Sequence, residues 1–146
     1  MRYLMPFAAA VFLLAGCASQ EEKQVLDFPA PKVALTIRDA GKKIALRPGE
    51  YAKISLKENA STGYSWFFRL DNGQKGPQPK EGQAVELAGE RVIPPKDMMP
   101  GAPGMRELMV KAVRPGTVYV VGNCLRPWDR DKEPAQTVRY RFEVAP

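Results

Sequence analysis

The chain has 146 residues, with 22 Lys and Arg against 16 Asp and Glu, two cysteines and no histidine. Without histidine, Ser-His and Cys-His nucleophile arrangements and histidine-based zinc sites are excluded, so we expect neither a hydrolase of the usual kinds nor a metal or other cofactor. The basic residues alternate with acidic ones along the chain, which favours a solvated surface of mixed charge over a nucleic-acid site.

Residues 1–16 have the pattern of a secretory leader. A basic start is followed by an almost uncharged run that is too short to span a bilayer as a mature helix. The run ends in Leu-Ala-Gly before Cys17, a pattern that a lipoprotein signal peptidase recognises. We therefore expect cleavage before Cys17 and a stable membrane anchor of two or three acyl chains on that residue. A plain signal peptide with an incidental cysteine is the alternative.

The segment after the cut, residues 17–32, is polar and then interrupted by prolines, which predicts a lipidated N-terminus and a flexible tether. Ala18 and Ser19 lack the aspartate that typically retains lipoproteins at the inner membrane of enteric-type bacteria. An exported protein anchored in the outer membrane is therefore favoured. With Cys17 lipidated, Cys124 has no intramolecular partner, and we expect a small buried apolar side chain there rather than a reactive thiol.

From residue 33 onward, short segments with alternating apolar side chains recur between glycine and proline turns. The expected strands are residues 33–37, 44–46, 51–57, 64–70, 84–93, 105–113, 117–125 and 137–144. No segment keeps a helical period over ten residues. The pattern predicts one all-β domain, residues 33–146, folded as an immunoglobulin-like antiparallel sandwich of about seven to eight strands. An OB-type barrel is the alternative.

Three connections hold residues that a simple turn does not require. In the first, residues 59–64, we expect a tight exposed bend with the hydroxyls of Ser61 and Thr62 at its tip. The second, residues 98–105, combines two glycines with two prolines and is therefore bare yet partly stiff, with methionines that either add apolar contact or fold back into the core. The third, residues 125–134, places an exposed tryptophan behind a proline and among charges.

The two tryptophans are expected to play different parts. Trp128 lies in the third connection, where it offers a large rigid contact area of the type enriched at binding hot spots. Trp66 lies in register with Phe68 on one face of a predicted strand, so we expect it to pack in the core.

The three connections carry short motifs in a fixed order: Asn59-x-x-Thr62-Gly63-Tyr64, Gly101-x-x-Gly104 and Arg126-Pro127-Trp128. Together they resemble the chagasin family of inhibitors of papain-like cysteine proteases, over most of residues 33–146. The resemblance implies an immunoglobulin-like sandwich and an inhibitor that is not an enzyme. The residues that it implies contact the protease are Asn59, Ser61, Thr62, Gly63, Tyr64, Gly101, Ala102, Pro103, Gly104, Arg126, Pro127 and Trp128.

The resemblance also implies how the loops act. The first enters the cleft beside the catalytic Cys and His of a papain-like peptidase from a host, a competitor or the same cell. The second runs along the non-primed groove by backbone contact, and the third packs on the other side. Binding is reversible, needs no covalent bond, and requires only a monomer. Family members commonly have Pro and Thr where this chain has Ala60 and Ser61, which makes the tip less preorganised. The alternative function is an immunoglobulin-like structural or accessory lipoprotein domain that docks onto an envelope complex.

Overall fold

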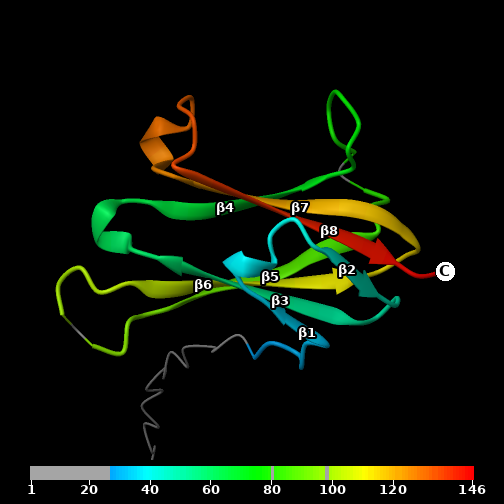
Figure 1. Cartoon of the computed structure of the whole chain (residues 1–146), viewed down its shortest axis with the longest axis horizontal. Helices are drawn as coiled ribbons and strands as arrows, with labels where there is room; N and C mark the ends of the chain where they lie inside the picture. Colours follow the sequence, from blue (N-terminus) through cyan, green and yellow to red (C-terminus); the bar gives the residue numbers. More distant parts are fainter. Residues whose placement is uncertain (1–26, 80, 98) are drawn as a thin grey trace, which may run out of the picture.

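The computed structural model describes residues 27–146 except 80 and 98. The expected leader, the lipidation site Cys17 and residues 18–26 of the tether lie outside the described residues. In the described part, eight strands form two four-stranded sheets that pack face to face (Figure 1). The all-β sandwich is therefore confirmed, and the two separate sheets exclude the OB-type barrel. No helix in this part of the chain has the length and apolar character needed to cross a membrane.

Each sheet combines strands from both halves of the domain. Sheet A has the order β1 (Val33–Leu35), β3 (Tyr51–Glu58), β6 (Gly104–Ala112) and β5 (Val85–Ile93). Sheet B has the order β2 (Lys43–Leu46), β8 (Gln136–Val144), β7 (Gly116–Leu125) and β4 (Ser65–Asp71). The inner pairs are antiparallel, but the edge strands β1 and β2 run parallel to β3 and β8. Alternation of apolar residues predicts the faces of a strand and carries no information on its direction.

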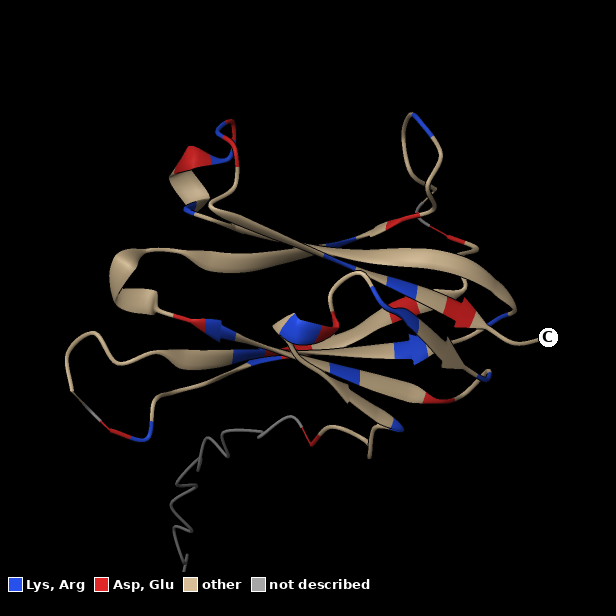
Figure 2. Ribbon diagram, viewed as in Figure 1, with Lys and Arg blue, Asp and Glu red and all other residues tan. Residues whose placement is uncertain are grey.

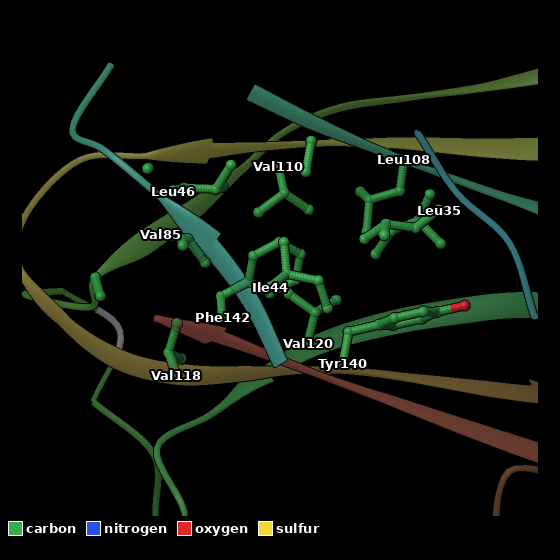
Figure 3. Close-up of a cluster of buried hydrophobic side chains, with 14 of the residues drawn as sticks. Leu35, Ile44, Leu46, Val85, Leu108, Val110, Val118, Val120, Tyr140 and Phe142 are labelled. Carbon is green, nitrogen blue, oxygen red and sulfur yellow. The ribbon is translucent and has the colours of Figure 1, made fainter. Parts of the chain in front are cut away.

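The core lies between the inward faces of the two sheets, and Figure 3 shows part of it. Its buried residues come from all eight described strands and from Ala84, just before β5. The predicted inward faces of residues 51–57 and 137–144 are confirmed. Their fully or nearly fully buried members are Ala52, Ile54, Leu56, Val138, Tyr140, Phe142 and Val144. Trp66 is 2% exposed and belongs to this core, whereas Trp128 is 70% exposed. Both expectations for the tryptophans are therefore confirmed.

The strand predicted over residues 33–37 ends earlier, at Leu35. Thr36 begins a short 3-10 helix, η1 (Ile37–Asp39), in which its side chain accepts a hydrogen bond from the Arg38 N–H and the Asp39 carboxylate accepts one from the Thr36 N–H. Ile37 is consequently 44% exposed instead of lying on the inward face with Leu35. The capping pattern Thr-x-x-Asp outweighs the apolar alternation here.

The chain meets the sandwich before the expected boundary at residue 33. The half-buried ring of Phe28 lies 3.3 Å from the position that a Cβ on Gly89 would occupy, and the Arg91 guanidinium stacks 4.3 Å from the ring centroid. The Lys32 N–H donates to the Tyr51 carbonyl at 2.8 Å. Phe28 and Lys32, which the sequence placed in the tether, therefore contact sheet A.

Tyr140 links the core to η1. Its hydroxyl donates to the Thr36 carbonyl at 2.9 Å, and burial, with a smaller contribution from Asp39, raises its pKa from 10.0 to about 12. In the unfolded chain the phenol ionises near the lower value, whereas in the folded chain it stays protonated to the higher one. The protonated Tyr140 side chain therefore stabilises the folded state fully below pH 10, and this contribution is lost as the pH rises toward 12.

We expect Tyr140→Phe to lower the free energy of unfolding by about 1 kcal/mol near pH 8, because one hydrogen bond is lost. Between pH 10 and pH 12 the difference between the natural protein and the variant should shrink, since only the natural protein carries the titrating phenol. Urea unfolding of both proteins across this range measures the difference. A difference that stays constant would contradict the assignment.

Candidate functional site

The three connections singled out from the sequence lie at the same end of the sandwich, opposite the C terminus (Figure 1). In the structure they correspond to the first loop (residues 59–64, between β3 and β4), the second loop (residues 94–103, between β5 and β6) and the third loop (residues 126–135, between β7 and β8). The predicted second and third connections, residues 98–105 and 125–134, extend into β6 and β7 by Gly104, Met105 and Leu125. The strands β3, β5 and β7 all end there. The topology therefore brings together motifs that are far apart in the sequence.

The first loop is closed by its own side chains. The Asn59 carboxamide oxygen accepts hydrogen bonds from the Ser61 N–H at 3.2 Å and the Ser61 hydroxyl at 2.6 Å. The Thr62 hydroxyl donates to the Asn59 carbonyl at 2.7 Å, and Gly63 ends the 3-10 helix η2 (Ala60–Thr62) with a φ of +78°. The two hydroxyls lie on the exposed tip, as expected, and they also hold its shape.

The second loop is bonded to the first. The Asn59 side-chain N–H donates to the Gly101 carbonyl at 3.0 Å. Gly101 needs to be glycine because its φ is +83°, whereas Gly104 is buried in β6, where a Cβ would approach the Ile93 carbonyl oxygen to 2.5 Å. Ala102 is half-buried and Pro103 is exposed. Gly104 is therefore positioned to permit close strand packing and offers no side-chain contact surface.

The third loop is held against the first by Arg126. Its Nε–H donates to the Thr62 carbonyl at 3.2 Å, and its guanidinium lies 4.6 Å from the centroid of the Tyr64 ring and 6.0 Å from that of Trp128. The Trp128 indole lies over Gly63, where an added Cβ would come within 2.5 Å of its Cη2 atom. Pro127 begins the 3-10 helix η3 (Pro127–Asp129) and is exposed.

A buried carboxylate lies at the start of the first loop, where β3 ends. Glu58 is 6% exposed and accepts hydrogen bonds from Arg106 Nε at 2.9 Å, Arg106 Nη2 at 2.8 Å and the Trp66 backbone N–H at 2.9 Å. The Trp66 indole N–H also donates to the Lys57 carbonyl at 2.9 Å. The Glu58 carboxylate raises the pKa of the Arg106 guanidinium, against the opposing effect of burial. These bonds tie β3 and β6 of sheet A to β4 of sheet B.

Glu58 was not among the site residues predicted from the sequence, although a signal was present. Glu58 continues the inward series Ala52, Ile54 and Leu56, so its position on an otherwise apolar face marks a buried charge that needs partners. Val92 and Ile93 were not predicted as site residues either, and they are 51% and 39% exposed at the end of β5. These apolar side chains directly precede the second loop.

The exposed surface at this end is apolar at some points and charged at others. Met99 of the second loop is 71% exposed, so it does not fold back into the core; Met98 lies outside the described residues. Figure 2 shows that the first loop carries no charged residue, whereas the third carries both signs. Large exposed apolar side chains on either side of an uncharged narrow tip are typical of a surface that binds another protein.

Cys124 lies in β7 close to the loops, half-buried against the core. Burial, together with the charge of Glu58, raises the pKa of its thiol, so the thiol stays protonated near neutral pH. This agrees with the expected apolar role. Within the residues that the structure describes, no group of three or more acidic or cysteine side chains could hold a metal ion.

Comparison with known proteins gives a consistent family. The sequence model of one protein family, the chagasin family peptidase inhibitors I42, matches residues 45–144 of this chain. This range contains all three loops. Amoebiasin-2 of Entamoeba histolytica is 28% identical over 92 residues, which cover 63% of this chain and 68% of the relative. Chagasin of Trypanosoma cruzi is 26% identical over 88 residues, which cover 60% and 76% of the two chains.

Solved structures share the fold. The crystal structure of the cysteine protease inhibitor EhICP2 from Entamoeba histolytica has a TM-score of 0.63 at 24% identity, covering 80% of this chain and all of that one. The structure of PbICP-C in complex with falcipain-2 has a TM-score of 0.52 at 21% identity, covering 82% and 95%.

The family match spans more than half of the chain and includes every motif on which the resemblance depended. The family consists of peptidase inhibitors, not enzymes. This chain belongs to the chagasin family of peptidase inhibitors.

Proposed function

We propose that this protein is a reversible, non-covalent inhibitor of papain-like cysteine peptidases that fills the active-site cleft with its three loops. The observation that carries the proposal is the set of direct contacts among the loops, which makes one surface from three separate segments. Family membership supports the same function, as does the structural relative that was solved in complex with falcipain-2.

The first loop suits a cleft that cleaves extended peptides. Its tip is uncharged and forms a 3-10 turn, in which the Thr62 and Gly63 N–H groups bond back to the Asn59 and Ala60 carbonyls. A peptidase nucleophile needs a peptide carbonyl in attack geometry, and a closed turn does not offer an extended segment to the cleft. The loop therefore fills the site without being cleaved.

The other two loops flank this tip. Gly101 presents bare backbone and Met99 an adaptable apolar side chain on one side, and Trp128 presents its indole on the other. Because Asn59 and Arg126 already bond the loops to one another, little conformational entropy is lost on binding. Arg126 is thus a positioning residue, which acts through Thr62 and Trp128.

Trp128→Ala should raise the inhibition constant toward papain by about tenfold or more, because a large exposed anchor is removed from the contact surface. Since Trp128 is 70% exposed, the variant should unfold at nearly the same urea concentration as the natural sequence. The measurement is a titration of papain with residues 18–146, which contain every strand.

Arg139→Ala is the matched control for this titration. Arg139 stacks 3.8 Å from the centroid of the Tyr119 ring on sheet B, away from the loops, and its loss should leave inhibition unchanged. Equal weakening by both substitutions would mean that the loops are not the contact surface. No inhibition by the natural sequence at micromolar concentration would overturn the proposed function.

Ala60→Pro should lower the inhibition constant about two- to fivefold. Ala60 is the first residue of η2, its N–H donates no hydrogen bond to the described residues, and Asn59 before it is extended, so proline fits and stiffens the unbound loop. Ser61→Pro is the opposite case, because it removes the N–H that bonds the Asn59 side chain. If Ala60→Pro weakened inhibition, the loop would not act as a preorganised tip.

We also propose that lipid on Cys17 holds the inhibitor at the cell envelope, with the outer membrane favoured. Because Phe28 and Lys32 contact sheet A, only residues 18–26 remain as tether, and a chain of that length spans at most roughly 30 Å. The domain would be confined near the lipid surface, where a high local concentration compensates for modest affinity.

Cys17→Ser should release the protein from the membrane fraction of cells that produce it, because the thiol that carries the lipid is lost. Fractionation, with mass spectrometry of the mature N-terminus, measures both lipid and cleavage. Cys124→Ser is the control and should leave the protein in the membrane fraction. Retention of the Cys17→Ser variant in membranes would refute the lipid anchor.

A further inference from the structure

One edge of sheet A is only partly covered. The strand β1 pairs with β3 at Ala52, Lys53 and Ile54, whereas β3 continues to Glu58. The chain cannot extend this pairing, because the next N–H, that of Thr36, donates to the Asp39 carboxylate at 2.9 Å and turns the backbone into η1. The edge of β3 beyond Ile54 is therefore left without a neighbouring strand.

A groove of about 520 Å³ runs along this part of the edge. It is lined by Thr36, Ile37, Arg38, Ser55, Leu56, Lys57, Trp66, Met105 and Gln136. Leu56 and Trp66 are buried side chains of the core, and Ile37 presents its apolar side chain at 44% exposure. The groove therefore combines apolar surface with a strand edge that no other strand covers, although the Lys57 carbonyl there already accepts the Trp66 indole N–H at 2.9 Å. Apolar surface and an uncovered strand edge are the two features by which proteins bind an added peptide strand.

The charge at the groove is positive. Arg38 and Lys57 are exposed and form no ion pair in the part of the chain that the structure describes. The nearby carboxylates are already bonded, Asp39 to Lys42 at 2.9 Å and Glu58 to Arg106 at 2.8 Å. Two unpaired cations beside an apolar groove favour an occupant with negative charge.

We propose that this groove binds an extended acidic peptide segment of a partner protein, which adds as a strand to the edge of β3. Alternate side chains of such a strand would lie toward Ile37 and Leu56, and its acidic residues would pair with Arg38 and Lys57. The surface is separate from the protease-binding tips, although Lys57 and Trp66 flank the first loop and Gln136 follows the third. The inference does not depend on peptidase inhibition.

The test uses intrinsic fluorescence and a defined peptide. The chain has two tryptophans, so in the Trp128→Phe variant the only indole is Trp66, which lines the groove and donates to the Lys57 carbonyl. The probe is acetyl-Glu-Val-Glu-Val-Glu-amide at low ionic strength. We expect a saturable change in fluorescence, and at least an approximately tenfold loss of affinity when Arg38→Glu and Lys57→Glu are added, because two charge pairs become repulsive.

Two controls separate strand addition from general attraction of a basic protein. The pair Arg47→Glu and Lys75→Glu changes the net charge equally at exposed positions outside the groove lining, and should leave the affinity within about twofold. A peptide with the same side chains but N-methylated at alternate residues cannot form the strand bonds and should not bind. The proposal would be overturned if both charge reversals lowered the affinity equally or if the methylated peptide bound as well as the parent peptide. It would also be overturned if the parent peptide caused no change in fluorescence.

Discussion

The loop end of this molecule depends on the buried carboxylate of Glu58. β3 and β4 follow each other in the chain but belong to different sheets, so the first loop must cross the core at its open end. Glu58 binds Arg106 from one sheet and the Trp66 N–H from the other, and Arg106 also reaches Glu90 on β5 at 3.4 Å. Removing one partner of a buried ion pair leaves an uncompensated charge, so this arrangement is strongly fixed once formed.

Fixed loop ends make the other loop contacts effective. Because the first loop begins directly after Glu58 and rejoins β4 just before Trp66, its internal hydrogen bonds and its contacts with Gly101 and Arg126 act on a short segment with little freedom. The Asn59 side chain bonds Ser61 within the first loop and Gly101 in the second, and in this way stiffens the tip through hydrogen bonds.

Much of this organisation could be predicted from the sequence because a strand has a two-residue period. Alternation identified the inward faces of β3 and β8, and the exposure of Trp128 followed from its proline and charged neighbours. The contact of Phe28 with Gly89 joins segments that are far apart in the sequence, so no local pattern could reveal it.

The sequence also does not show why each glycine of the second motif is required. Both glycines of the second motif read alike in the sequence, yet Gly101 is required by its φ and Gly104 by a carbonyl from a neighbouring strand. The hydrogen bonds between the loops also join residues that are far apart in the sequence. The short motifs could therefore indicate that the three loops act together, but not which atoms bond.

The central claim is that three preformed loops enter a peptidase cleft as one unit. A crystal structure of this protein bound to papain tests it most directly. We expect all three loops to contact the cleft, and the bonds from Asn59 to Gly101 and from Arg126 to Thr62 to persist in the complex. A complex formed through another face, or loops that enter only after these bonds break, would contradict it.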